Sequence, residues 1–488
     1  MRNIRHRGAE AQLFNLKFQR SNFKSEGGAP ASLCLRVGLL VAAFFLPALG
    51  AARVAAQGGG PVAQVERAAG LLREGKIEEA ERHLVAVLKG APNEAGALNL
   101  LGTIRAQQGK LDEAEALFTR AARADRRFVG PRMNLAYLYH LKNVPEKAIV
   151  PLGEVLGLDP DNADAAQKLA RLLLKGNRLD ECIELAEGLK RRGRAPAALL
   201  AIQGDAHLGK GDLKGAEESY SLALGQGPGD PTALLGMAQV ALGKGDAEGA
   251  AGFLARAREA AAGSPDLLYG YAVVALRAGL GDEAGEALAR AARLRPDDKR
   301  VVLLSGVSWL RRRRPDLSEA EQSFRRFLEL QPASPQGQLF LGYVLLKQKR
   351  SAEARALLES SVKADAAAPE GFYYLGLIAQ DEQDEGRAVT ILEDVTRRFP
   401  SFPHAHVALG VSYMRMKDYE RARRELETAV RLSPGDQKAH YNLALLYARV
   451  KEPARAQEEM RIVEELRGKA DARMEEDDFS ASPAPRPQ

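Results

Sequence analysis

The amino-acid sequence predicts an all-α fold, a superhelical solenoid of about twelve 34-residue helix-turn-helix repeats. A small residue returns at steps of 34, beginning with Ala80, Ala114 and Ala148. Within each step, apolar residues recur three and four positions apart in two runs separated by a short turn, which is the period of amphipathic helices. In the second run a large side chain stands between two small ones, as Phe118 does between Ala114 and Ala121. This alternation favours close packing of neighbouring helices.

The 34-residue step divides residues 61–470 without gaps. The register slips by two residues at the segment RRRRPD, Arg311–Asp316. The predicted repeats are 61–94, 95–128, 129–162, 163–196, 197–230, 231–264, 265–298, 299–334, 335–368, 369–402, 403–436 and 437–470.

Each part of a repeat has its own sequence signal, and the second repeat illustrates most of them. Its first helix carries a large residue followed by a small one, Leu101 and Gly102, and the small one lets a neighbouring helix approach. Gly109 closes this helix, because a chain that reverses after a helix commonly needs a positive φ. In most repeats a proline such as Pro160 ends the second helix.

This order of residues resembles the tetratricopeptide repeat family: Leu-Gly or Leu-Ala, an aromatic residue three positions on, Ala, a large residue four further on, Ala again, and then Pro. The resemblance covers residues 61–470. Two departures occur in the second repeat, where Arg105 replaces the aromatic residue and Arg126 replaces the proline. The resemblance implies a concave groove, lined by the first helix of every repeat, that binds segments of other proteins through positions 2, 5, 9, 12 and 13 of the repeat.

The groove of the last four repeats is the predicted binding surface. We expect three tyrosines to act as apolar anchors and three basic residues to form an edge along the same wall, so that the ligand is an acidic segment with apolar side chains. These ligand-binding residues are Tyr343, Tyr373, Tyr441, Lys347, Arg415 and Arg449. An alternative is that the basic residues at position 13 are solvated helix ends favoured by the helix dipole. No repeat has Asn at position 9, where chaperone-binding members of the family hold a carboxylate.

Residues 1–56 form a basic leader that ends in the apolar run VGLLVAAFFLPAL, Val37–Leu49. Basic residues, a short apolar run and small residues are the order of a secretory signal peptide. The segment before the apolar run is long for a signal peptide, so the alternatives are cleavage or retention of residues 37–52 as an N-terminal membrane anchor. We expect an exported protein of the bacterial periplasm or envelope.

The charge distribution argues against a nucleic-acid partner. The chain has 70 basic and 64 acidic residues, and the leader holds eight of the basic and two of the acidic ones. The remaining chain is therefore balanced, with 62 of each. A protein that binds a phosphate backbone needs many neutralising contacts, so no nucleic acid is expected.

No catalytic, metal or cofactor site is predicted. Cys34 lies in the leader, and Cys182 takes a slot that other repeats fill with Ala, which leaves no disulfide framework or cysteine-rich zinc site. His404, His406 and His440 suggest a metal only weakly, because residues two apart on a helix face different directions. The twelve repeats account for all of residues 61–470, so no part of that span is left for a catalytic domain.

Residues 471–488 are acidic and rich in proline, and we expect them to be a disordered tail. The sequence thus predicts a non-enzymatic scaffold for protein–protein interaction. Two alternatives stay open: a structural component of a polysaccharide or protein export machine, and a cytoplasmic scaffold whose N-terminus is misassigned.

Overall fold

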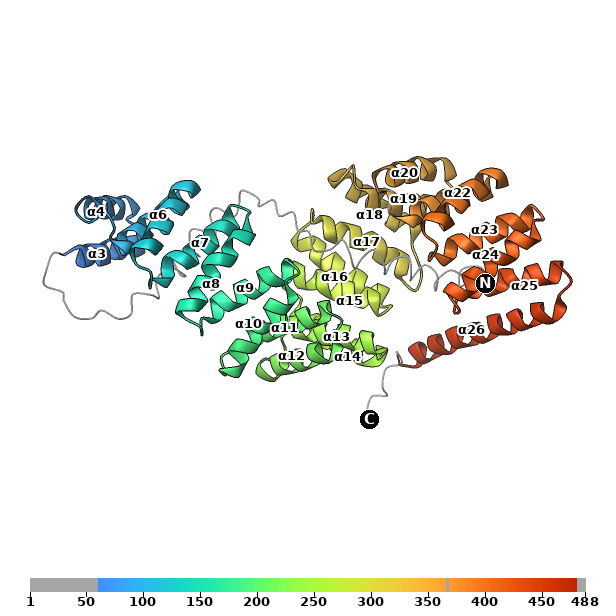
Figure 1. Ribbon diagram of the computed structural model, residues 1–488, viewed down its shortest axis with the longest axis horizontal. Coiled ribbons are helices and arrows are strands. Elements are labelled where there is room, and N and C mark those ends of the chain that lie inside the picture. Colours follow the sequence, from blue (N-terminus) through green and yellow to red (C-terminus); the bar gives the residue numbers. More distant parts are fainter. Residues whose placement is uncertain (1–59, 366–367, 481–488) are drawn as a thin grey trace, which may run out of the picture. The chain divides into compact units, whose positions relative to one another are not determined.

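Paired helices follow one another along the chain, as the period of the sequence predicts (Figure 1). The computed structural model describes residues 60–365 and 368–480. These residues contain 24 α-helices, α3–α26, one short 3-10 helix, η3, and no strand. The prediction of an all-α solenoid is confirmed. The leader, 1–56, and the last residues, 481–488, lie outside the described residues.

The described residues form two compact units that divide between Ala261 and Ala262. The N-terminal unit contains six helical pairs. They are α3 (Pro61–Arg73) and α4 (Ile77–Gly90), α5 (Ala95–Gln107) and α6 (Leu111–Ala124), α7 (Val129–Leu141) and η3 (Pro145–Ala148) with α8 (Ile149–Leu158), α9 (Ala163–Lys175) and α10 (Leu179–Arg191), α11 (Ala197–Gly209) and α12 (Leu213–Gln226), and α13 (Pro231–Lys244) and α14 (Ala247–Ala260).

The C-terminal unit contains the other six pairs. They are α15 (Pro265–Arg277) and α16 (Gly281–Leu294), α17 (Lys299–Arg311) and α18 (Leu317–Leu330), α19 (Pro335–Lys347) and α20 (Ser351–Ala364), α21 (Pro369–Asp381) and α22 (Glu385–Arg398), α23 (Pro403–Arg415) and α24 (Tyr419–Leu432), and α25 (Gln437–Arg449) and α26 (Pro453–Ser480).

The core of each hairpin is built from the small-large-small pattern. In the second hairpin Ala114, Phe118 and Ala121 are all buried on one face of α6. A Cβ added at Gly102 of α5 would lie 2.7 Å from the ring of Phe118, so the glycine lets the two helices approach closely. The pattern therefore marks contacts between the helices of one repeat, as predicted.

In eleven of the twelve described hairpins the turn between the paired helices has one residue with positive φ whether or not that residue is glycine, and the exception is the turn between α17 and α18. Gly109 has a φ of 76° at this turn. The same place in later repeats holds Asn177, Lys349 and Lys417, all with φ between 57° and 67°. A residue with a Cβ adopts this left-handed conformation at a cost in free energy, so in these repeats packing of the two helices sets the turn.

The C-terminal helix, α26, continues to Ser480. The disordered tail expected at residues 471–488 stays a prediction. Helix-forming residues fill the stretch 471–480, and the first proline after Pro453 is Pro483. The acidic composition that suggested disorder is therefore compatible with continuation of the last helix.

Candidate functional site

The first helices of the last four hairpins form a continuous layer. α19 contacts α21, α21 contacts α23, and α23 contacts α25, in addition to the contact that each makes with its own second helix. Positions 5, 9 and 13 of these repeats lie on this layer. The layer therefore brings the predicted binding residues onto one set of helices.

Tyr343 on α19 and Tyr373 on α21 are joined through a third tyrosine. Each has a ring centroid 5.3 Å from that of Tyr374, which is also on α21. Phe402 lies edge-on to Tyr373 at 5.7 Å. Tyr343, Tyr373 and Tyr374 are only 6–7 % exposed. The two predicted anchors thus belong to a packed aromatic cluster.

Sequence reasoning missed Tyr374 and Phe402 as members of this cluster. Tyr374 takes position 6 of its repeat, and Phe402 directly precedes α23. The sequence feature that could have identified Tyr374 is the pair of consecutive tyrosines, Tyr373 and Tyr374, because side chains of consecutive residues point about 100° apart on a helix. One of them can therefore face the layer while the other packs against the neighbouring repeat.

Tyr441 on α25 differs from the other two predicted tyrosines. It is 40 % exposed, whereas they are buried. Lys347, in the last turn of α19, places its Nζ atom 5.4 Å from the ring centroid of Tyr343. The accessible part of the predicted site is therefore centred on Tyr441.

Three arginines at position 13 contact the preceding repeat. Arg311 donates a hydrogen bond from Nη1 to the carbonyl oxygen of Leu276, 3.0 Å away and 35 residues earlier. Arg415 does the same to Gln380 at 3.3 Å and forms an ion pair with Glu385 at 2.7 Å. The last carbonyl groups of a helix lack partners within the helix, so they are natural acceptors for an arginine from the next repeat.

Arg449 follows the same path back to the preceding repeat. Its Nη1 atom lies 3.8 Å from the Sδ atom of Met414, again 35 residues earlier. In the sequence these arginines are interpreted as a binding edge or as solvated helix ends, and neither interpretation includes a contact with the preceding repeat. These arginines fix the spacing of adjacent first helices, and their outer faces are left at the surface.

An aspartate in the N-terminal unit was also missed by sequence reasoning. Asp205, at position 9 on α11, accepts a hydrogen bond of 2.6 Å from the hydroxyl of the fully buried Tyr220. Burial raises the pKa of Asp205 from 3.8 to about 6, although the hydrogen bond from Tyr220 and the charge of Arg171 act in the opposite direction. A carboxyl group with a raised pKa on a first helix is a functional candidate.

The histidines that suggested a metal take part in structural contacts. His406 has Nδ1 2.6 Å from Glu425 Oε2 and Nε2 3.0 Å from the carbonyl oxygen of Pro400. His440 repeats this arrangement one unit later, with Glu459 and Pro434. Among the described residues, no group of three or more His, Cys, Asp or Glu side chains is placed to hold a metal ion.

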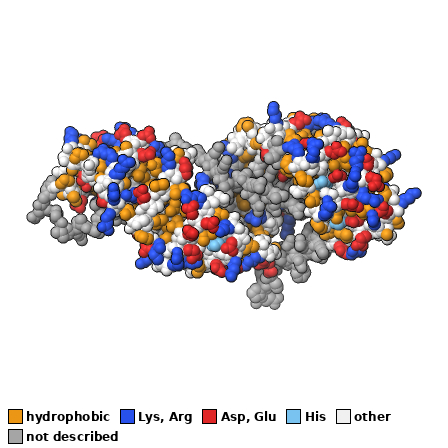
Figure 2. Space-filling model, in the orientation of Figure 1, with side chains coloured by type: hydrophobic (Ala, Val, Ile, Leu, Met, Phe, Trp, Pro, Cys, Tyr) orange, Lys and Arg blue, Asp and Glu red, His pale blue; other side chains and the backbone are white. Residues whose placement is uncertain are grey.

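The charged side chains are not gathered into one basic stripe on the visible face. Figure 2 shows basic, acidic and hydrophobic side chains interspersed over both units. Within the part of the chain that the structure describes, no helix has both the length and the apolar character needed to cross a membrane.

Stacked helical hairpins whose first helices form one layer define the class of helical-repeat solenoids, a fold that supports protein–protein interaction. This chain belongs to the tetratricopeptide repeat family. One family model described as a tetratricopeptide repeat matches residues 65–127, 308–369 and 407–470, and a second matches residues 143–205, 207–264 and 241–305. No curated protein matches the chain.

Solved structures with similar helical arrays share little sequence with this chain. The Cut9 and Hcn1 hetero-tetramer of the APC/C matches with 15 % identity and a TM-score of 0.41, covering 83 % of this chain and 94 % of that chain. Yeast Tom70 matches with 15 % identity and a TM-score of 0.41, covering 87 % and 97 %. A tetratricopeptide repeat protein from Parabacteroides merdae matches with 18 % identity and a TM-score of 0.41, covering 51 % and 99 %. At this level the likeness does not bear on function.

Proposed function

We propose that this protein is a non-enzymatic scaffold that binds a segment of a partner protein along the first helices of the last four repeats. Tyr343 and Tyr373 form the aromatic floor of the surface, and Tyr441 is its accessible anchor. Lys347, Arg415 and Arg449 supply positive charge, which suits an acidic segment with apolar side chains. The observation that carries the proposal is the 40 % exposure of Tyr441 on the same layer of helices as the buried tyrosine cluster.

Site-specific photo-crosslinking in cells tests this surface. A photoreactive amino acid at Tyr441 should crosslink to a discrete partner, whereas the same amino acid at the exposed Arg424 on the second helix α24 should not. Arg449→Glu should reduce the crosslink at position 441 about tenfold, because it reverses a charge at the edge of the surface.

The matched control is Arg431→Glu, which reverses an exposed charge on α24, away from the first helices. This variant should leave the crosslink unchanged. Equal crosslinking from positions 441 and 424, or equal loss in the two charge variants, would place the partner elsewhere.

The envelope location is a second part of the proposal and rests on the leader, 1–56. An exported scaffold should lack Met1 after cleavage of the signal peptide, or should fractionate with membranes if residues 37–52 are kept as an anchor. N-terminal sequencing of fractionated native protein distinguishes these two outcomes. A soluble cytoplasmic form that begins at Met1 would contradict export, and a cytoplasmic form that begins at a later start would support the alternative of a cytoplasmic scaffold with a misassigned N-terminus.

A role as a structural component of a polysaccharide or protein export machine is the remaining alternative. It differs from the scaffold proposal in the identity of the crosslinked partner. Crosslinks from position 441 to outer-membrane or export proteins would favour it.

A further inference from the structure

The second helix of the third repeat departs from all the others in the N-terminal unit. Pro145 opens a 3-10 turn, η3, of 4 residues, and α8 continues it for 10, so this second helix has the same 14-residue span as α4, α6, α12 and α14 but begins with a different helical turn. Two glycines, Gly153 and Gly157, remove side chains from the outer side of α8. A Cβ added at either glycine would meet nothing within 4 Å. Of the two, Gly157 lines the space beside α6, and the lack of a side chain there leaves that space open.

This space is a hollow of about 740 Å³ between α6, α7 and α8, wholly within the N-terminal unit. Its volume falls in the range of small-ligand and side-chain pockets, about 300–1,000 Å³. Apolar side chains are accessible in its wall: Val150 is 67 % exposed and Leu158 is 40 % exposed. Exposure of two large aliphatic side chains beside a hollow favours an apolar occupant.

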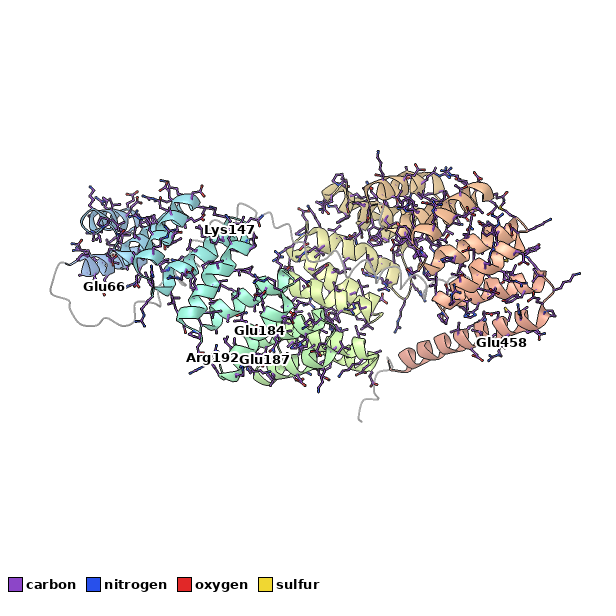
Figure 3. The ribbon with its side chains drawn as sticks, in the orientation of Figure 1. Glu66, Lys147, Glu184, Glu187, Arg192 and Glu458 are labelled. Atoms are coloured by element: carbon purple, nitrogen blue, oxygen red, sulfur yellow. The ribbon has the colours of Figure 1, made fainter. Side chains whose placement is uncertain are left out.

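The same hollow carries excess positive charge. Arg132 is paired with Glu154 at 2.7 Å, and this is the one acidic side chain among the lining residues. Arg123 and Arg126 are exposed on the opposite side. Lys147, labelled in Figure 3, comes from η3, and its Nζ atom lies 6.0 Å from the ring centroid of Tyr139. Arg123, Arg126 and Lys147 thus surround the apolar wall. The one acidic side chain of the lining, Glu154, is already paired with Arg132, so it does not balance their charge.

We propose that this hollow is a second protein-binding site, which takes an acidic peptide segment bearing one aromatic or large aliphatic side chain. The apolar side chain contacts Val150 and Leu158, and the flanking carboxylates pair with Arg123, Arg126 and Lys147. Charge complementarity selects an acidic segment over a neutral or basic one. The site lies in the third repeat and the one before it, in the N-terminal unit, so it is separate from the first-helix layer of the last four repeats that carries the proposed function.

The chain itself provides a matched pair of variants. Gly157→Trp fills the hollow with an indole ring, whereas Gly153→Trp places the same ring elsewhere on α8. Both remove a glycine from a helix and neither Cβ meets a neighbour, so both variants should fold. Arg126→Glu and Arg127→Glu form a second pair, because Arg127 is exposed but does not line the hollow.

Selection from a phage-displayed random dodecapeptide library on the full-length protein, with counter-selection on Gly157→Trp, tests the site. We expect the selected peptides to be acidic and to share one aromatic or large aliphatic residue. The fluorescein-labelled consensus peptide should bind at least about tenfold more weakly to Gly157→Trp and Arg126→Glu than to wild type, measured by fluorescence anisotropy. Gly153→Trp and Arg127→Glu should bind as wild type does.

Other outcomes overturn the inference. Selected peptides without acidic character, or a consensus peptide that binds Gly157→Trp as tightly as wild type, would contradict it. A peptide of residues 471–488 that competes at the same concentration as the consensus peptide would identify the chain's own acidic end as the occupant in place of a partner. Arg449→Glu should leave binding of the consensus peptide unchanged, and Gly157→Trp should leave the crosslink at position 441 unchanged. The experiments can therefore contradict one of the two proposed sites without contradicting the other.

Discussion

Gly236→Val should destabilise the N-terminal unit by about 3 kcal/mol, the largest effect that we expect from a single substitution in this chain. A Cβ at this position would lie 2.2 Å from the Cζ atom of Tyr220, and the ring of Tyr220 is fully buried. The ring cannot retreat toward α11, because a Cβ at Gly204 would lie only 2.5 Å from it on that side. Its hydroxyl is also held by Asp205 at 2.6 Å. A small movement of the ring therefore cannot relieve the overpacking.

Two built-in probes can report on the two units separately. Trp309 is the single tryptophan of the chain and lies in the C-terminal unit. Cys182 lies in the N-terminal unit with 0 % exposure, and burial raises the pKa of its thiol to about 12, so it should react with a thiol reagent only after local opening. A Cys34→Ser background removes the other thiol.

In that background, Gly236→Val should speed labelling of Cys182 by about two orders of magnitude while the urea midpoint of Trp309 fluorescence stays nearly constant. Gly225→Val is the control, because a Cβ at Gly225 on α12 meets nothing within 4 Å. An unchanged labelling rate in Gly236→Val would mean that Tyr220 is not confined as the geometry indicates.

Asp205→Asn should stabilise the same unit, by about 1–2 kcal/mol at pH 7. Burial raises the pKa of this carboxyl group from 3.8 to about 6, which means that the fold disfavours the charged form. A shift of two pKa units corresponds to about 3 kcal/mol, and we discount that value because the side chain is only partly buried. Asparagine keeps an oxygen that can accept the hydrogen bond from Tyr220.

The stabilisation should depend on pH with a definite sign. Well below pH 3.8 the carboxyl group is protonated in both the folded and the unfolded protein, so wild type and variant should approach equal stability toward about pH 3. As the pH rises from about 4 to about 6, the unfolded chain releases the proton of Asp205 while the folded protein keeps it, so wild type loses stability that the variant keeps, and the difference levels off above pH 6. Urea unfolding followed by far-UV circular dichroism at pH 4, 5, 6 and 7 measures the difference. A difference that is constant with pH would contradict the assignment.

The period of the chain could be predicted from the sequence because it depends on local chemistry. Ala114, Phe118 and Ala121 alternate small and large at helical spacing, and this pattern specifies one face of a helix with little help from the rest of the fold. Gly109 marks a turn by its freedom at positive φ. The helical hairpins and the tetratricopeptide family follow from these features.

The functional candidates depended on contacts between repeats, which spacing alone does not encode. Tyr343 and Tyr373 were read as exposed anchors, yet both are packed against Tyr374, whereas Tyr441 at an equivalent position is exposed. Position 13 arginines such as Arg415 were read as part of a surface edge, and they also hold the last turn of the preceding first helix.

By itself, then, the sequence determined the helical period, the hairpins and the small-large-small core, because each results from interactions within about one repeat. Only the tertiary structure decided which tyrosines are accessible, which carboxyl group has a raised pKa and where a hollow opens between α6, α7 and α8. Those properties depend on burial by residues about one repeat away in the chain. The left-handed turn at Lys417 has the same origin: nothing in a lysine predicts a positive φ, and the packing of α23 against α24 imposes it.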